Sequence, residues 1–315
     1  MEKKYKIYIA GHRGLVGSAI VRKLQNEGYR NLVLKTRTEL DLLDQKSVTD
    51  FFAQEKPDYV FLAAAKVGGI MANKDFPAEF IYENLMVQAN VLEQSRKNGV
   101  KKLLFLGSSC IYPRLAPQPI KEKYLLSGPL EPTNQAYAIA KIAGVITCQS
   151  YNKEFGTNFI SAMPTSLYGQ NDNFDLEHSH VLPSLIRKFY EAKKHNQNEI
   201  TLWGSGKAKR EFLHVDEFAD AAIFLMKHYN DSEIINVGTN EDISIKALAE
   251  LVKKITGFKG KILWDKTKPD GSPRKLLDVS KIHALGWHHK KTLEEGIRET
   301  FDWFQKSQKE IKVKN

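Results

Sequence analysis

Hydrophobic positions in the first half of the chain form short apolar runs separated by amphipathic stretches. Runs of the kind that is buried in parallel sheets occur at residues 6–10, 31–35, 59–64, 102–106 and 158–163. Between them, apolar residues recur at helical spacing, as Val16, Ile20 and Leu24 do. Strands alternating with helices indicate crossover connections between parallel strands. The pattern therefore predicts an α/β fold with a doubly wound parallel sheet.

Caps and breakers predict where the helices lie. Asp44 is a typical N-cap for a helix that Pro57 would end. Helices are also expected over about 77–98, from 136 to 146, from 180 through 188, and over 215–229, 244–256 and 292–308. After residue 168 the strand–helix alternation loosens, which predicts a second, smaller α/β lobe. We expect residues 1–168 to form the first domain with 214–238 returning to it, and 169–213 with 239–315 to form the second lobe.

Composition narrows the class of protein. The 315 residues carry a net charge of +10, but the lysines are scattered and no basic stretch is interleaved with aromatics, so nucleic acid is not an expected partner. Small polyanions are attracted by such a charge. Only Cys110 and Cys148 are cysteines, which fits a reducing compartment. With no signal-peptide pattern and no apolar stretch of ~20 residues, we expect a cytoplasmic protein with no membrane or metal site.

A glycine-rich turn follows the first predicted strand. Gly11, Gly14 and Gly17 stand between that strand and the predicted helix, with Arg13, Leu15 and Val16 among them. Strand, glycine turn and helix are the context that the dinucleotide fingerprint requires, because the backbone must approach a pyrophosphate at the helix N-terminus. The turn therefore predicts a Rossmann-type cofactor domain, with these six residues at the cofactor.

The end of the second predicted strand distinguishes NADP from NAD. An NAD enzyme usually has an acid there for the ribose 2′-hydroxyl, but the sequence has Lys35-Thr36-Arg37 and no acid before Glu39. Arg37, together with Arg13, suits a 2′-phosphate, so we predict NADP(H). The alternative is a solvated basic loop. Asp41 and Leu42 are expected at the adenine.

Tyr137 and Lys141 lie four residues apart in an apolar run that is predicted to be helical. At this spacing the two side chains share a helix face. A nearby ammonium favours phenolate, which would make Tyr137 a usable general acid or base. The alternative is a core tyrosine and a surface lysine. The serine-rich strand end Gly107-Ser108-Ser109-Cys110 strengthens the functional interpretation.

Together, the glycine turn, this strand end and the Tyr137–Lys141 pair resemble the extended short-chain dehydrogenase/reductase family. The resemblance extends over essentially the whole chain. Within that family the chain is similar to the epimerase/reductases of GDP-4-keto-6-deoxy-D-mannose, on segments that include Ala63 to Ile70, Glu131 to Asn134, Ser179 to Val181, Arg210 to Asp216 and Lys268 to Gly271. This resemblance implies that the protein uses NADPH, acts on a GDP-sugar and forms a homodimer built on two long helices.

The resemblance also implies catalytic roles. Tyr137 would protonate the C4 oxygen of the sugar, Lys141 would stabilise the phenolate and hold the nicotinamide ribose, and Ser108 would donate to the same oxygen. Cys110 and His180 match the acid–base pair that inverts C3 and C5. Each has an alternative, since Cys110 could be a small buried hydrophobe and His180 a helix cap.

Further binding residues are expected on the same basis. Ala63, Ala64, Ala65, Pro164, Leu167 and His180 would contact the cofactor, and Lys188, Trp203, Arg210 and Asp270 the substrate. Arg210 could instead form a salt bridge to Glu211 or Asp216, and Trp203 could be a core residue. Ser166, Gln170 and Lys188 depart from the commoner residues of the family, which affects how the sugar is positioned.

Two other functions compete with epimerisation and reduction. The first is a simpler nucleotide-sugar 4-ketoreductase or 4-epimerase, which would not need Cys110 and His180. The second is a catalytically silent NADP-binding regulator, which would not need Ser108, Tyr137 and Lys141.

Overall fold

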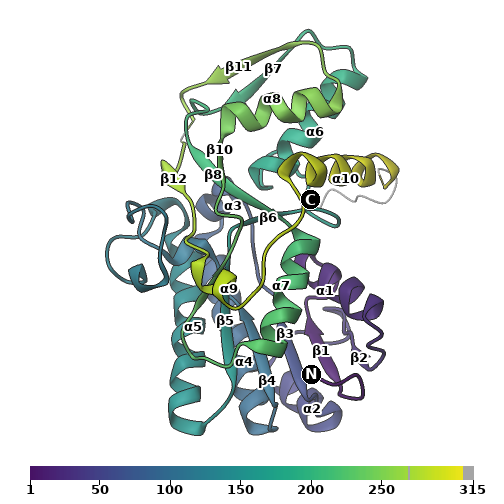
Figure 1. Ribbon diagram of the computed structural model, residues 1–315, viewed down its shortest axis with the longest axis vertical. Helices are drawn as coiled ribbons and strands as arrows, with labels where there is room; N and C mark the ends of the chain where they lie inside the picture. The colour runs from purple at the N-terminus through teal and green to yellow at the C-terminus, as the bar shows by residue number, and fades with distance from the viewer. Residues whose placement is uncertain (269, 308–315) are drawn as a thin grey trace.

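A six-stranded parallel sheet lies at the centre of the first lobe in the computed structural model, which describes residues 1–268 and 270–307 (Figure 1). Its order is β2-β1-β3-β4-β5-β9, and every neighbouring pair is parallel. The strands are β1 (Ile7–Ala10), β2 (Leu32–Val33), β3 (Tyr59–Leu62), β4 (Lys102–Leu106), β5 (Phe159–Pro164) and β9 (Ile235–Val237). From β1 the chain runs outward to β2 and then returns to β3 on the other side. The carboxyl ends of β1 and β3 therefore border the crevice where such sheets bind ligands.

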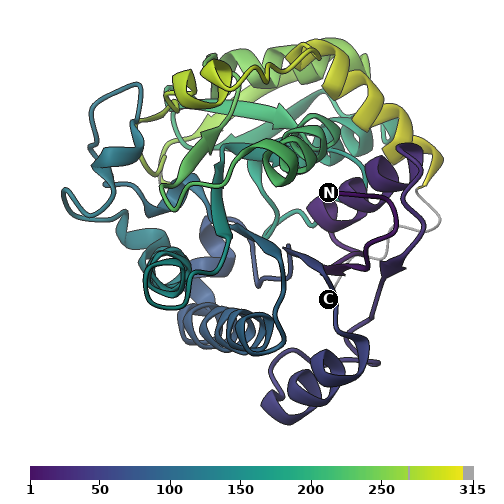
Figure 2. The same cartoon turned by 60° about the horizontal axis from the view of Figure 1, so that its bottom comes forward.

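Helices cover both faces of this sheet (Figure 2). On one face α1 (Leu15–Asn26) packs against α7 (Val215–His228). On the other, α4 (Pro77–Lys97) lies beside α5 (Gln135–Phe155), and α2 (Gln45–Glu55) packs against α4. The short helices α3 (Ile70–Asp75) and α9 (Ser280–Ala284) lie near the start of α4 and beside β9. The expected doubly wound fold is confirmed.

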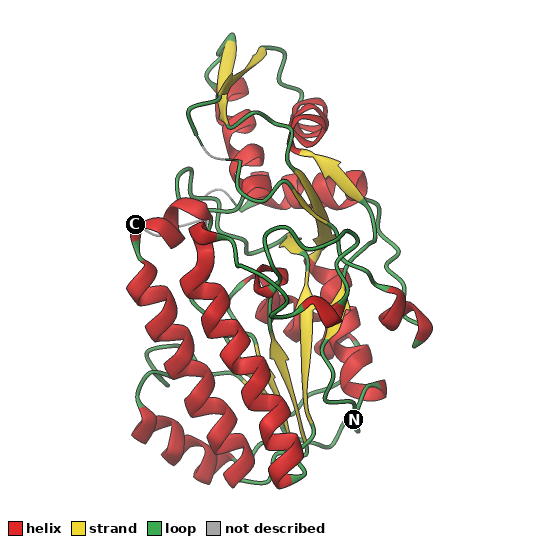
Figure 3. Ribbon diagram, turned by 90° about the vertical axis from the view of Figure 1, so that its left-hand side faces the viewer, coloured by secondary structure: helices red, strands yellow, loops and turns green. Residues whose placement is uncertain are grey.

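The second lobe has its own sheets and hydrophobic core (Figure 3). In one sheet β8 (Lys209–His214) lies between β10 (Asp242–Ser244) and β12 (Arg274–Lys275), and β6 (Ser166–Tyr168) also pairs with β8. A separate parallel pair joins β7 (Glu199–Trp203) to β11 (Lys261–Asp265). The helices are α6 (Val181–Lys194), α8 (Ile245–Thr256) and α10 (Leu293–Lys306).

Most predicted helix boundaries agree with the structure within a few residues. The Asp44 carboxylate accepts from the Lys46 N–H at 2.9 Å and so caps α2. The helix of Tyr137 continues to Phe155, where Gly156 ends it in a left-handed conformation with φ 66°. The strand expected over 31–35 is shorter, because only Leu32 and Val33 pair, at the edge of the sheet. The end of the helix expected to reach 308 lies outside the described residues.

The lobe division stays a prediction, although the packing bears on it. Strand β9 and helix α7 belong to the first core, as the returning segment 214–238 requires. Leu277, Val279, Ile282 and Trp287 also lie in that core, although they come from the segment assigned to the second lobe. They are held there because the chain after β12 crosses back, with the Asp278 N–H bonded to the Ile120 carbonyl at 2.8 Å. Within residues 1–268 and 270–307, no helix is both long and apolar enough to span a membrane.

Candidate active site

The glycine turn is packed tightly between β1, β3 and α1. Gly11 has a φ of 82°, and a Cβ placed on it would lie 2.7 Å from the Ala64 backbone nitrogen. A Cβ on Gly17 would overlap the Gly11 carbonyl and lie 2.8 Å from the His12 Cα. A Cβ on Gly14, in contrast, would meet only the Gly11 oxygen, at an ordinary 3.5 Å. Gly11 and Gly17 are therefore required by internal packing, whereas Gly14 is bare on its exposed side.

Gly14 is also the N-cap of α1, and it offers no side chain to accept the first N–H groups of that helix. Such donors attract an anion, and the positive end of the helix dipole adds to the attraction. A pyrophosphate thus fits the turn. Ala63, Ala64 and Ala65, half-buried, continue from β3 directly beneath it, with the Ala63 N–H bonded to the Ala10 carbonyl at 3.1 Å.

Basic residues border the glycine turn and the loop that follows β2. Arg13 and Arg37 are both exposed. The Glu39 carboxylate is already hydrogen-bonded, because it accepts from the backbone N–H and the hydroxyl of Thr36 at 2.8 and 2.6 Å. The acid nearest to the predicted ribose position is therefore turned back on its own loop, which leaves the two arginines to meet a 2′-phosphate. Asp41 accepts from the Leu43 N–H at 3.0 Å, and Leu42 packs on the first core.

Ser108, Tyr137 and Lys141 come together where β4 ends beside α5. Ser108 is the N-cap of the turn Ser109–Ile111, and its hydroxyl oxygen accepts from the Cys110 N–H at 3.1 Å. The Lys141 ammonium donates to the Leu106 carbonyl at 2.8 Å and lies 5.9 Å from the centre of the Tyr137 ring. Lys141 is buried, so it is not the surface lysine of the alternative interpretation.

The expectation that Lys141 lowers the pKa of Tyr137 is wrong for the protein alone. Burial, reinforced by the nearby Cys110, raises the pKa of Tyr137 above its ordinary value, and a hydrogen bond with Ser108 only partly opposes this. Burial also lowers the pKa of Lys141 to about 8, and its ammonium is committed to the Leu106 carbonyl. Tyr137 is therefore a neutral phenol, the state that a proton donor needs.

Cys110 faces a cation that the sequence had not indicated. The Lys275 ammonium, on β12, donates to the Cys110 sulfur at 3.4 Å. Burial alone would raise the pKa of Cys110, but Lys275, the Ser108 hydrogen bond and Arg210 outweigh it and lower the pKa. Cys148, fully buried, shows the contrast, because burial raises its pKa to about 12. Cys110 is thus not a plain buried hydrophobe.

His180 precedes α6 as its N-cap residue, but its side chain makes no capping hydrogen bond. Its side chain is exposed, and partial desolvation by the surrounding protein lowers its pKa. The preceding residues are docked on the loop after β3, where the Gly69 N–H bonds the His178 carbonyl at 2.8 Å. Within residues 1–268 and 270–307, no hydrogen bond or ion pair joins His180 to Cys110 or Tyr137. Ser108, Cys110, Tyr137 and Lys141, four of the five expected catalytic residues, are thus brought together. His180 has no such bond to them in the described residues, and the hydrogen bond between Gly69 and His178 holds its segment on the loop after β3.

The expected substrate residues gather around Trp203. The Lys188 ammonium lies 5.1 Å from the Trp203 ring centre, and that of Lys268, which was not among the expected substrate residues, lies 5.5 Å from it. Trp203 is 40% exposed, so it is not a core residue. The Asp270 carboxylate is held by the backbone and hydroxyl of Ser205 at 2.8 and 2.6 Å.

The alternative salt bridges of Arg210 do not form. Asp216 pairs with Arg22 at 2.6 Å, and the buried Glu211 accepts from backbone N–H groups. The Arg210 guanidinium instead donates to the carbonyls of Lys209 and Asp270 at 2.7 and 3.2 Å. Arg210 thus keeps its charge available in the cleft.

The last two expected cofactor residues flank the exit from the sheet. Pro164 ends β5 and pairs with β9, and Leu167, on β6, is half-buried against the first core. In the described part of the chain, no cluster of three or more side chains is arranged to hold a metal ion.

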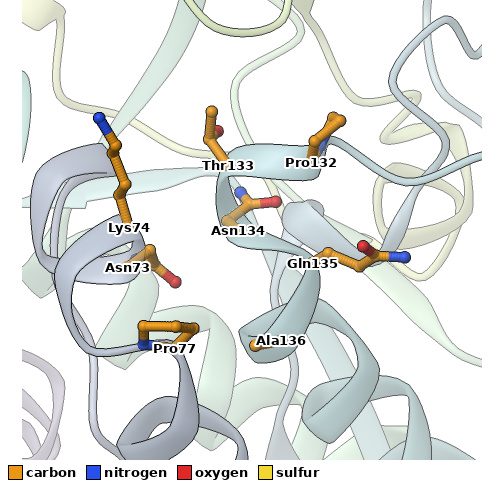
Figure 4. Close-up of a pocket in the computed structure, with 8 residues that line it drawn as sticks. All are labelled: Asn73, Lys74, Pro77, Pro132, Thr133, Asn134, Gln135 and Ala136. Atoms are coloured by element: carbon orange, nitrogen blue, oxygen red, sulfur yellow. The ribbon is translucent and has the colours of Figure 1, made fainter.

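A separate hollow of about 210 Å³ lies between α3 and the start of α5 (Figure 4). Asn73 and Lys74 form one wall and residues 132–136 the other. The side-chain oxygens of Asn73 and Asn134 are buried there without a hydrogen-bond partner. None of the expected site residues lines this hollow.

Comparison with known proteins agrees with this site. The model of the NAD dependent epimerase/dehydratase family matches residues 7–238, which include the glycine turn, the central sheet and α5. The chain belongs to this family. The resemblance to the extended short-chain dehydrogenase/reductases is thereby confirmed.

Relatives within the epimerase/dehydratase family extend over nearly the whole chain. It is 61% identical over 304 residues to a putative GDP-L-fucose synthase 2 of Arabidopsis thaliana, covering 96% of this chain and 93% of that protein. It is 52% identical to the GDP-L-fucose synthase of Escherichia coli (strain K12), covering 97% and 98%. Among solved structures, a GDP-mannoheptose C4 reductase from Campylobacter jejuni with NADP bound is 45% identical with a TM-score of 0.90, covering 97% and 99%.

Sequence reasoning missed the roles of Lys275, Lys268 and Glu211. Lys268 and Glu211 lie inside segments that carry the resemblance and Lys275 lies just after one, but a single lysine or glutamate has no pattern of its own. Lys275 stands 165 positions from Cys110. The pairing of β12 with β8 brings it to the thiol, and nothing local in the sequence predicts that pairing.

Proposed function

We propose that this member of the epimerase/dehydratase family converts GDP-4-keto-6-deoxy-D-mannose to GDP-L-fucose, by inverting C3 and C5 and reducing C4 with NADPH. The observation that carries the proposal is the Cys110–Lys275 contact beside Ser108. A C4 reductase needs one proton donor at the carbonyl. A cysteine whose pKa is lowered at the same place supplies a base that reduction does not require.

The reduction rests on Ser108, Tyr137 and Lys141. Tyr137, as a neutral phenol, gives its proton to the C4 oxygen. The Ser108 hydroxyl, whose oxygen accepts from the Cys110 N–H and which lies beside Tyr137, can donate its hydrogen to the same C4 oxygen. Lys141, fixed on the Leu106 carbonyl, holds the ribose and favours the phenolate that remains. Bound NADPH supplies the hydride.

The cofactor would be held by the residues at the mouth of the crevice. The free N–H groups at the start of α1 take the pyrophosphate, with bare Gly14 allowing close approach. Arg37 and Arg13 take the 2′-phosphate, to which a guanidinium can donate two parallel hydrogen bonds.

The inversions rest on the acidity of the carbons next to the 4-carbonyl. Cys110 as thiolate removes a proton from C3 or C5, and His180 returns one to the opposite face. The enolate formed in between carries negative charge, which raises the pKa of His180 and favours its protonated form. Arg210, Lys188 and Lys268 supply positive charge for the diphosphate, and the exposed Trp203 ring offers a stacking surface.

Assembly as a homodimer also belongs to this proposal. Tyr82 on α4 and Ile139, Ile146 and Phe155 on α5 are exposed apolar side chains on the two long adjacent helices. Such a surface supports pairing of these helices with a second copy.

The test is to incubate the protein with NADPH and GDP-4-keto-6-deoxy-D-mannose in deuterium oxide. We expect loss of NADPH absorbance and, by NMR, a product with inverted, deuterated C3 and C5. Cys110→Ser should still oxidise NADPH but give a 6-deoxy sugar of uninverted configuration. Wild-type product without inversion would identify a plain C4 reductase. NADPH binding without turnover would identify a silent regulator.

A further inference from the structure

Lys275 is held rigidly against Cys110 by the strands of the second lobe. In the β12–β8 pairing, Lys275 lies opposite Arg210. Two residues farther on, the Leu277 N–H donates to the buried Glu211 carboxylate at 2.9 Å. Glu211, next to Arg210 on β8, also accepts from the N–H groups of Thr239 and Asn240 at 2.5 and 2.7 Å. The Leu277–Glu211 bond and the pairing with Arg210 therefore fix β12 against β8, which places the backbone of Lys275 where its ammonium reaches the sulfur.

The groups that face the Cys110 sulfur favour a negative charge on it. Lys275 reaches it from β12, Arg210 from β8, Ser108 from the end of β4, and Tyr137 from α5. The first two are cations and the last two are neutral. In the part of the chain that the structure describes, Lys275 forms no ion pair with a carboxylate. Its charge is thus not compensated by any group other than the thiol.

We propose that Lys275 is a positioning residue for the epimerisation, which keeps Cys110 as a thiolate and directs the sulfur toward the substrate. The role of that thiolate as base rests on the proposed function. In the step itself the C–H bond next to the carbonyl breaks, an S–H bond forms, and the electron pair moves to the carbonyl oxygen. His180 then gives a proton to the opposite face of the same carbon. Exchange with water restores the thiolate and the imidazolium.

The first test needs no substrate. The thiolate absorbance of the full-length protein is titrated with pH, with Cys110→Ser as the blank, and iodoacetamide modification of Cys110 is followed by mass spectrometry. For the wild type we expect a midpoint below the ordinary thiol value of ~8.5. Lys275→Met should raise the midpoint by at least about one pH unit, because removing an adjacent opposite charge shifts a pKa by ~1–3 units. Lys275→Arg should keep it low.

Lys209→Met is the matched control. Lys209 lies on β8 next to Arg210, and its ammonium points to Asp242, 3.8 Å away. The same net charge is lost, but the thiol midpoint should not move. A wild-type midpoint at or above the ordinary value would overturn the proposal, even if Lys275→Met failed to fold. So would a folded, NADPH-binding Lys275→Met with the wild-type midpoint.

The second test separates this proposal from the proposed function. In Lys275→Met, deuterium uptake at C3 and C5 should fall at least tenfold at neutral pH and recover as the pH rises, while NADPH oxidation is largely kept. If the midpoint moves with Lys275 but the wild type takes up no deuterium, the thiolate pair is real and the epimerase function is wrong. If uptake is normal in Lys275→Met at every pH, Lys275 has no part in it.

Discussion

The glycine turn allows fold and cofactor contacts to be tested apart, by changing Gly17 or Gly14 to alanine. In Gly17→Ala the new methyl would overlap the Gly11 carbonyl and lie 2.7 Å from the Gly11 carbonyl carbon. Ordinary contact begins near 3.4 Å, and the opposing atoms are backbone, so α1 has to move away from the turn. Overpacking of this kind costs about 3 kcal/mol, of which alanine's better helix propensity returns about 1. The net loss is about 2 kcal/mol, which lowers Tm by roughly 3 °C in a chain of this length.

Gly14→Ala should behave differently. The backbone at Gly14 has φ −77° and ψ 174°, which any residue can adopt, and the methyl meets nothing closer than 3.5 Å. The gain from a stiffer unfolded chain and the loss of a favourable N-cap nearly cancel, so stability should stay within about 0.5 kcal/mol. NADPH affinity should nevertheless fall at least tenfold, since the methyl occupies the space through which a pyrophosphate would approach the α1 N–H groups.

Urea and thermal unfolding measure the first effect, and titration of NADPH fluorescence measures the second. Wild-type stability in Gly17→Ala would refute the packing argument. Wild-type NADPH affinity in a stable Gly14→Ala would refute the placement of the pyrophosphate.

Three further outcomes follow from the site. Arg37→Ala should weaken NADPH binding by roughly 10–150-fold, the effect of losing one charge-assisted hydrogen bond, and should leave NADH binding nearly unchanged. If fluorescence titrations showed equal losses of affinity for both cofactors, the 2′-phosphate contact would be excluded. Tyr137→Phe should still bind NADPH but reduce the keto sugar roughly 10²–10⁴-fold more slowly in stopped-flow assays; a wild-type rate would mean that another group is the acid. Glu211→Gln should cost about 2 kcal/mol in urea unfolding, because the amide cannot accept from all three N–H groups. Glu294→Gln, which removes a solvated carboxylate, should leave the unfolding midpoint nearly unchanged, and equal losses would contradict the role of the buried Glu211 carboxylate.

Local patterns were enough to predict the first lobe. The order of strand, glycine turn and helix is written in consecutive residues, and so is the pairing of Tyr137 with Lys141 one helical turn later. The short β2 was overestimated, because apolar residues at 31–35 do not reveal that only two of them pair at an edge. The pKa of Tyr137 was misjudged because a sequence shows that a lysine is near but not how far the surrounding protein desolvates the phenol and the ammonium.

The second lobe was less predictable, because its strands pair across long separations. β7 pairs in parallel with β11, and β8 with β10 on one side and β12 on the other. Register between distant strands depends on the whole packed lobe and not on nearby residues. Lys275, Lys268 and Glu211 could therefore be seen in the sequence but not assigned to the cleft.

The late position of β12 in the chain has a consequence during synthesis. A ribosome adds residues from the N-terminus, and N-terminal domains generally fold first. When Lys141 has emerged, Ser108, Tyr137 and Lys141 are all present. Lys275 follows only after the chain from β5 through β11 has been made. The nascent protein thus has its reducing residues long before Lys275 can reach its cysteine. Until β12, the last strand, is in place, the thiol of an unfinished chain lacks the contact with Lys275 that favours its reactive form.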